Sequence, residues 1–338
     1  MKTKLVIFLT LCCIVVLTAC NKESNQTKSQ QDTVKIKNTY EFKEKNKDHK
    51  NGEIINETLE VPTNPKRVVV MDYGALDVMK ALKLQKNIVA IAKGQGNSFL
   101  PNSLKEFKDK KYRNIGNPGQ PNFNNLAKAK PDIIFASFRQ ARSKTLAEMK
   151  KAAPNAKIIF VSPQNDNYID SIKQNTMKIG KIFKKETEVK ALNRSLDKKI
   201  TATRKVIDNS TVLFLNVDDK GIKTFGPTGR FGGFLNKDLG IKHADKNMQA
   251  NSSGILISNE YLNKINPDKL FVVDRTKQAS SQSKALPPSL DNDVIKNVEA
   301  IKQHHVSVFE ANSWYFGEGG IGLTIDQLDQ IQKAYRAK

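Results

Sequence analysis

Two stretches of this chain repeat one arrangement, LAKAKPDIIFAS at 126–137 and LNKINPDKLFVVD at 262–274. Each has the composition of a helix end, followed by the pattern Lys-x-x-Pro-Asp and a run of apolar residues typical of a buried strand. Helices that alternate with buried strands indicate a parallel sheet covered by helices on both faces. The repeat therefore predicts two α/β lobes of similar construction within one chain.

The alternation of strands and helices continues on both sides of the repeats. Strand-like runs are VVVM (68–71), NIVAIA (87–92), AKIIFVS (156–162), STVLFLNVD (210–218) and HHVSVFE (304–310). Between the third and fourth runs lies a helical stretch, roughly 167–207, with at most one break near Lys184 and Lys185. Its apolar residues form no single stripe, which suits a helix that contacts two bodies.

We therefore expect two Rossmann-like lobes, each a mostly parallel sheet with flanking helices, joined by one long α-helix. The boundaries are an N-terminal lobe at 57–165, a linking helix region at 166–207 and a C-terminal lobe at 208–338. Two lobes joined by one helix leave a cleft between them, and clefts of this kind commonly bind small ligands.

The N-terminal segment has the organisation of an export signal. Two lysines precede an apolar run from Leu5 to Leu17, which is too short for a bilayer-spanning helix of about 20 apolar residues. The residues LTAC at 17–20 resemble a bacterial lipobox, in which the cysteine is acylated and becomes the first residue of the mature chain. We expect a signal peptide at 1–19 and a lipid anchor at Cys20 on the extracytoplasmic face of the cell membrane. The alternative is a plain signal peptide that contains a cysteine.

The segment after Cys20 is polar. Lys, Asn, Gln and Glu dominate 21–56, so we expect 20–56 to form a lipidated, disordered tether. Because Cys12 and Cys13 lie in the removed signal, the mature chain has no disulfide or thiolate metal site.

The chain is strongly basic, with 56 Lys and Arg against 34 Asp and Glu and a net charge of +22. Nucleic acid, an anionic surface and an anionic ligand are the partner classes that this charge admits. Neither zinc-finger spacing nor interleaved arginines and aromatics occur, so a nucleic-acid partner is not expected. The lysines are scattered, and solvation beside an anionic surface accounts for most of them.

The stretch NSWYFGEGGIG at 312–322 contains a G-x-G-x-x-G pattern at Gly317, Gly319 and Gly322. A dinucleotide site needs a βαβ unit opening on this pattern and an acidic residue about 20 positions later. Only sixteen residues follow Gly322, enough for one terminal helix, so the nucleotide interpretation is disfavoured. We expect a glycine loop that displays Trp314 and Tyr315, and burial of these two aromatics in the core is the alternative.

Signs of an enzyme or of a metal site built by the protein alone are weak. The chain has no G-x-S-x-G elbow and no Ser, His and Asp in a suggestive context. The adjacent His304 and His305 would point to opposite faces of a strand and cannot ligate one metal together. We therefore expect a binding protein with no tightly bound cofactor.

Three arginines follow the ends of predicted strands or turns: Arg139 in IIFASFRQ, Arg230 in FGPTGR and Arg275 in LFVVDR. In open α/β sheets, residues beyond the carboxyl ends of the strands line the ligand crevice. The planar guanidinium donates several hydrogen bonds and keeps its charge, which suits a bulky oxyanion. The alternative for each arginine is a surface salt bridge.

Together the lipobox, the tether, the paired lobes and these motifs resemble the iron-siderophore substrate-binding lipoproteins of ABC importers. The resemblance covers about 61–337 and rests on SFRQ (137–140), FGPTGRFGGF (225–234), VVDR (272–275) and WYFGEGG (314–320). It implies a monomeric receptor for ferric catecholate siderophores that delivers them to an ABC permease and its ATPase for iron uptake. Iron complexes of catecholamines are further candidate ligands.

The resemblance also implies roles for individual residues. Arg139, Arg230 and Arg275 would bind the anionic complex, and its catechols would pack on Phe138, Phe231, Trp314 and Tyr315. Some relatives have an iron-ligating histidine where this chain has Leu235, so Tyr315 is the candidate iron ligand. Glu260 would dock the permease from the second lobe, and the first-lobe contact is unassigned. A haem or cobalamin receptor of the same fold and a surface adhesin are the alternative functions.

Overall fold

Each sequence repeat forms a helix, a left-handed turn and a central strand in the computed structural model, which describes residues 32–44, 52–97, 99–276 and 286–337. Helix α2 (Phe123–Ala129) is capped by Asn122, and helix α6 (Asn259–Ile265) is capped by Ser258 at the corresponding position. They end at Lys130 and Asn266, both left-handed, with φ of 43° and 48°. The proline that follows each left-handed residue cannot extend the helix, so the chain turns into the strand.

The aspartate of each repeat joins its strand to the neighbouring strand. A carboxylate oxygen of Asp132 accepts hydrogen bonds from the backbone N–H groups of Lys66 and Arg67, both at 2.9 Å. Asp268 accepts from the backbone N–H and the hydroxyl of Thr211, at 2.7 and 2.8 Å. These bonds set strand β8 beside β3 and strand β14 beside β10, so the predicted two-lobe α/β architecture is confirmed at its repeats.

Among the described residues, the first lobe contains a five-stranded parallel sheet in the order β5-β4-β3-β8-β9. Its strands are β3 (Val68–Val70), β4 (Ile88–Ile91), β5 (Arg113–Asn114), β8 (Ile133–Ala136) and β9 (Lys157–Phe160). Its α-helices are α1 (Tyr73–Ala81), α2 and α3 (Ser143–Ala152), with 3₁₀ turns η1 (Gln85–Asn87), η2 (Gln95–Asn97), η3 (Asn102–Lys108) and η4 (Phe138–Gln140). A small hairpin of β6 (Gly116–Asn117) and β7 (Gln120–Pro121) completes the lobe.

In the second lobe, the described residues form a mixed sheet in the order β13-β11-β10-β14-β15, with β12 also paired to β10. Its strands are β10 (Thr211–Asp218), β11 (Gly221–Thr224), β12 (Lys242–His243), β13 (Ile255–Ile257), β14 (Lys269–Asp274) and β15 (Val306–Phe309). Its helices are α6, α7 (Glu299–Lys302), α8 (Ala311–Tyr315) and α9 (Ile321–Arg336), with the π-helical η5 (Gly233–Asp238) and the 3₁₀ turn η6 (Pro288–Leu290). Both sheets have a buried hydrophobic cluster on each face, as expected of sheets covered by helices.

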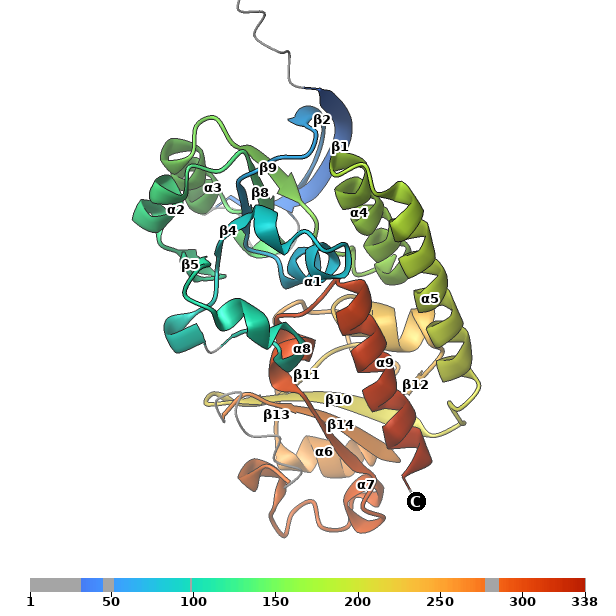
Figure 1. Ribbon diagram of the computed structural model, residues 1–338. Helices are drawn as coiled ribbons and strands as arrows, with labels where there is room; N and C mark the ends of the chain where they lie inside the picture. Colours follow the sequence, from blue (N-terminus) through green and yellow to red (C-terminus); the bar gives the residue numbers. More distant parts are fainter. Residues whose placement is uncertain (1–31, 45–51, 98, 277–285, 338) are drawn as a thin grey trace, which may run out of the picture. The chain divides into compact units, whose positions relative to one another are not determined.

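The linker is not one continuous helix but two, α4 (Tyr168–Ile182) and α5 (Glu186–Arg204), which meet at the single break near Lys184 and Lys185 that the sequence allowed. Lys184 between them is left-handed, with φ of 54°, and Gly180 lets α5 pack closely because a Cβ there would lie 2.7 Å from Val189. Both helices contribute to the cores of both lobes, Ile172 and Leu196 to the second and Ile179 and Val189 to the first. Figure 1 shows α5 beside α9. The prediction that this region contacts two bodies is confirmed.

The predicted disordered tether is wrong for 33–42 and 53–56. Strands β1 (Thr33–Phe42) and β2 (Glu53–Pro62) form an antiparallel hairpin, while the predicted signal peptide, Cys20 and 45–51 lie outside the described residues. Ile36 is 2% exposed, and the buried Asn38 donates to the carbonyl of Ile158 and accepts from the N–H of Phe160. The hairpin is therefore part of the first lobe, attached at the edge strand β9.

Asn38 gives a direct test of this attachment. Asn38→Ala is expected to lower the free energy of unfolding by about 2 kcal/mol, because it leaves buried backbone groups of β9 without partners. The neighbouring Thr39 is the control, since its hydroxyl bonds to the exposed Asn56, and Thr39→Ala should cost less than about 0.5 kcal/mol. Urea unfolding of both variants measures the difference, and equal costs would contradict the attachment.

The glycine run lies at a contact between the lobes. Asp77 of α1 accepts hydrogen bonds at the start of α9, from the N–H of Gly322 at 2.7 Å and of Leu323 at 3.4 Å. A Cβ at Gly322 would lie 2.6 Å from an Asp77 oxygen, and a Cβ at Gly74 would lie 2.5 Å from the backbone of Gly319. These glycines allow α1 and α9 to approach each other, which explains the pattern without a nucleotide.

Asp77 makes the stability of this contact dependent on pH. Burial raises the pKa of Asp77 to about 6 from its ordinary value of 3.8, although the N–H groups of Gly322 and Leu323 lower it. Nearby Asp326 raises the pKa further and Lys80 lowers it. Because the folded state holds the proton more tightly than the unfolded state, its contribution to stability is complete below about pH 4 and is lost as the pH rises through about 6.

Between about pH 4 and pH 7 the raised pKa of Asp77 should cost the unchanged protein up to roughly 3 kcal/mol of its free energy of unfolding. Asp77→Asn is expected to remove this loss. Urea unfolding at a series of pH values measures this. Asp291→Asn is the control because Asp291 is exposed, and it should leave the profile unchanged. A profile for Asp77→Asn parallel to that of the unchanged protein would contradict the assignment.

Candidate functional site

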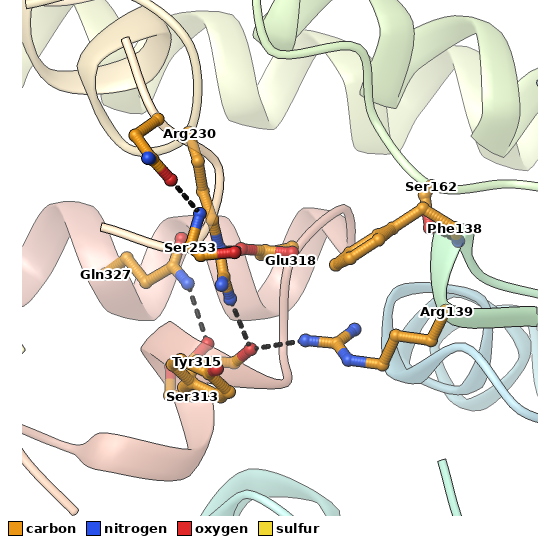
Figure 2. Close-up of polar contacts among 10 residues, drawn as sticks. Phe138, Arg139, Ser162, Arg230, Ser253, Ser313, Tyr315, Glu318 and Gln327 are labelled. Atoms are coloured by element: carbon orange, nitrogen blue, oxygen red, sulfur yellow. Dashed lines mark hydrogen bonds and ion pairs between the residues drawn. The ribbon is translucent and has the colours of Figure 1, made fainter. Parts of the chain in front are cut away.

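The three arginines found in the sequence meet around Tyr315. Arg139 and Arg230 each donate through Nη2 to the Tyr315 carbonyl, at 2.8 and 3.0 Å, as Figure 2 shows. The guanidinium carbon of Arg275 lies 3.5 Å from the centroid of the Tyr315 ring, and that of Arg230 lies 4.3 Å from it. The first-lobe arginine and the two second-lobe arginines thus lie around one residue, as the sequence predicted.

Arg139 is positioned by the turn that follows β8. Ser137 caps this turn, and its backbone N–H donates to the Gln140 side chain at 2.7 Å in a capping box. The N–H of Phe138 donates to the Ser162 hydroxyl, which in turn donates to Asp72 at 3.0 Å. Burial raises the pKa of Asp72 to about 6, against the effects of hydrogen bonds from Ala75 and Ser162 and of the charge of Arg139.

Arg230 is positioned by the loop before η5. The next residue, Phe231, has a φ of 60°, a left-handed conformation that is unusual for an aromatic residue. The Phe231 ring stacks on Phe214 at 4.4 Å, and the guanidinium carbon of Arg230 lies 4.8 Å from the Phe231 centroid. Only 8% of Arg230 is exposed, so its charge is fixed in a largely dry environment.

Glu318 is a site residue that the sequence reasoning missed. Its Oε1 lies 2.7 Å from Nε of Arg230, and the two side chains are 11% and 8% exposed. Burial opposes the charge of Arg230, but Glu318 and Tyr315 raise its pKa overall. An acidic residue inside a glycine loop, GEGG at 317–320, was the signal that could have identified it.

Tyr315 lies in a field of positive charge. Burial by itself raises the pKa of its phenol, but Arg230, Arg275 and Arg139 together bring it below its ordinary value of 10. Arg275 is 25% exposed, and its Nη1 lies 3.8 Å from Asp218, which also pairs with Lys223 at 2.9 Å. Arg275 is thus held more loosely than Arg230.

Two of the aromatic residues predicted to contact the ligand are buried. Trp314 is 1% exposed and stacks on Phe309 at 4.8 Å, so it belongs to the core of the second lobe. Phe231 is 7% exposed and lies against Phe214 and Arg230. Phe138 is 44% exposed, with the Arg139 guanidinium 4.4 Å from its ring, so it is available to a ligand.

The described residues contain no group of three His, Cys, Asp or Glu side chains that could hold a metal ion. Tyr315 is half-buried at the arginines, and Leu235 is buried at 3% exposure. Glu260 lies apart from them, exposed in the first turn of α6. Within the same described ranges, no helix has the length and apolar character needed to cross a bilayer.

Comparisons with known proteins agree on one family. The family model for periplasmic binding proteins matches residues 68–312. The petrobactin-binding protein YclQ of Bacillus subtilis is 34% identical over 334 residues, 98% of each chain. In the comparison with its crystal structure, 90% of this chain matches the whole of that chain, with a TM-score of 0.75 and 31% identity. A second similar structure is that of the periplasmic catecholate-siderophore binding protein VctP of Vibrio cholerae. Here 89% of this chain matches the whole of that chain, with a TM-score of 0.72 and 26% identity.

Proposed function

This chain belongs to the periplasmic binding protein family, and from that membership we propose that it captures a ferric catecholate siderophore at the arginines around Tyr315. Members of the family bind substrates and do not transform them, so the chain is a substrate-binding protein and not an enzyme. The observation that carries the proposal is the convergence of Arg139, Arg230 and Arg275 on one tyrosine. The names of YclQ and VctP, a petrobactin-binding and a catecholate-siderophore binding protein, support the same ligand class.

Charge explains how the site would hold such a ligand. Three catecholate dianions around Fe(III) give a complex with a net charge of about −3. Each charge-assisted hydrogen bond from an arginine contributes roughly 1.5–3 kcal/mol, and the partly buried site screens it less than water does. Glu318 offsets one of the three positive charges, so the arginines and Glu318 together carry a formal charge of +2 (3 − 1). The exposed Phe138 ring would pack on a catechol.

Tyr315 would be the protein's iron ligand if the siderophore leaves coordination positions open. The arginines favour its phenolate form by lowering its pKa against the effect of burial. Phenolate is a ligand of ferric iron in other iron proteins. The iron complex is the cargo, and no resident cofactor is proposed.

Delivery would follow from an anchor and a docking surface. Cys20 would carry the lipid anchor, and the monomeric receptor would meet an ABC permease with its ATPase at the extracytoplasmic face. Glu260 is exposed, and hydrogen bonds from Ser258 and its own N–H lower its pKa, so it stays charged. The repeat places Asn124 of α2 where Glu260 stands in α6, so the two lobes would offer different groups to the permease.

Titration of the chain from Asn21 onward with a ferric tris-catecholate tests the proposal. Trp314 is the only tryptophan and adjoins Tyr315, so the coloured complex should quench its fluorescence in a saturable way. Haem and cobalamin are titrated in parallel. Absence of catecholate binding by a folded protein would overturn the proposal, and binding of haem or cobalamin instead would identify another ligand of the same fold. Binding of none of the three would favour a surface adhesin.

A further inference from the structure

The first lobe contains a strongly basic cavity of about 320 Å³. Besides Val89 and Ala129, its lining residues are all cationic: Arg67, Lys110, Lys111, Arg113 and Lys128. We propose that this basic pocket binds a phosphate-bearing anion and is a site separate from the siderophore site.

The basic pocket lies at the opposite edge of the first-lobe sheet from Arg139. Arg67 directly precedes β3, Arg113 begins β5, and Lys128 is in the last turn of α2, which leads into β8. These positions are all at the amino ends of the parallel strands. Arg139, by contrast, follows the carboxyl end of β8. An anion in the basic pocket would therefore not compete with the siderophore.

The charges of the basic pocket are mostly uncompensated. Among the described residues, Lys110, Arg113 and Lys128 form no ion pair, and Lys111 lies 3.8 Å from the exposed Asp109. Arg67 donates through Nε and Nη2 to the carbonyl groups of α2's last turn, including Ala129 at 2.6 Å. These bonds hold its guanidinium at the wall without cancelling its charge. Five cations around one hollow repel each other, and an anion would relieve that repulsion.

The side chains present favour phosphate among anions. Two guanidinium groups and three ammonium groups offer many donors, and a phosphate group presents several acceptor oxygens and up to two charges. The volume is at the lower end for small-molecule sites, which fits a diphosphate or a phosphorylated headgroup better than an isolated phosphate. Because Val89 and Ala129 are the only apolar lining residues, a mainly hydrophobic ligand would gain little. The phosphate could belong to an anionic lipid headgroup or to a soluble compound.

Binding of inorganic pyrophosphate to the chain from Asn21 onward, measured by calorimetry, tests the site. Lys110→Gln with Lys128→Gln removes two positive charges from the basic pocket, and Lys150→Gln with Lys151→Gln removes the same two charges from exposed positions on α3. We expect the pocket variant to weaken pyrophosphate binding about tenfold and the α3 variant less than about twofold. Equal loss in both variants, or no binding to the unchanged chain, would overturn the proposal.

Vesicles distinguish the two sources of phosphate. Co-sedimentation with phosphatidylglycerol vesicles that is lost in the pocket variant and kept in the α3 variant would identify a lipid headgroup. Pyrophosphate binding without such a vesicle effect would identify a soluble ligand. Ferric catecholate binding should be unchanged in both variants, so this proposal and the proposed function can fail independently.

Discussion

Arg230→Gln is expected to weaken the binding of a ferric tris-catecholate by about a hundredfold or more, the largest loss among the three arginines. The substitution removes a positive charge and also leaves the Glu318 carboxylate without its partner at 2.7 Å. A ligand with a charge of about −3 then meets a buried negative charge that was previously neutralised. The formal charge of the arginines and Glu318 falls from +2 to +1, and the Glu318 charge that remains has no partner beside the ligand.

The same change at Arg139 or Arg275 should cost about tenfold. Arg139 forms no ion pair among the described residues, and Arg275 is 25% exposed and 3.8 Å from Asp218. Trp314 fluorescence titrations of the three variants measure the order of the effects. Thermal unfolding must accompany them, because an unpaired buried carboxylate costs about 3–5 kcal/mol of stability. If the three folded variants lose the same affinity for the ferric tris-catecholate, the pairing of Arg230 with Glu318 does not make Arg230 more important than the other two arginines.

The sequence was sufficient to predict those features of the fold and the site that depend on residues close together in the chain. The Lys-x-x-Pro-Asp turns predicted the two lobes because a left-handed residue, a proline and an aspartate act within a few positions of each other. The arginines could be predicted for a similar reason, since the carboxyl ends of adjacent parallel strands meet at one edge. The hairpin at 33–62 was missed although residues 34, 36, 38, 40 and 42 alternate as a strand does, because its polar composition suggested disorder.

Other features depend on contacts between distant residues. The charge of Glu318 is compensated by Arg230, 88 positions away, and Asp77 caps α9 from 245 positions away. Trp314 and Tyr315 are adjacent on a short helix, so their side chains point about 100° apart and only one can face the arginines. The sequence places both at the same loop and does not say which one is buried.

Glu318→Gln is expected to tighten the binding of anionic iron complexes in proportion to their charge. Removing one negative charge from the site changes the interaction with a complex of about −3 three times as much as with a complex of about −1, because the Coulomb energy is proportional to the ligand charge. We expect a gain of about tenfold or more for a ferric tris-catecholate and about twofold for the ferric complex of a tetradentate bis-catecholate. Calorimetry with both complexes measures the ratio, and Glu299→Gln in the first turn of α7 is the charge-matched control.

A double variant connects the two predictions. With Glu318→Gln present, Arg230→Gln no longer exposes a buried carboxylate, so its cost for the tris-catecholate should fall to the roughly tenfold expected at Arg139 and Arg275. If Glu318→Gln instead shifts both complexes by the same factor, Glu318 acts only by holding Arg230 in place. A shift that increases with ligand charge would mean that Glu318 sets the charge of the site, and that the site favours siderophores of lower charge more than three free arginines would.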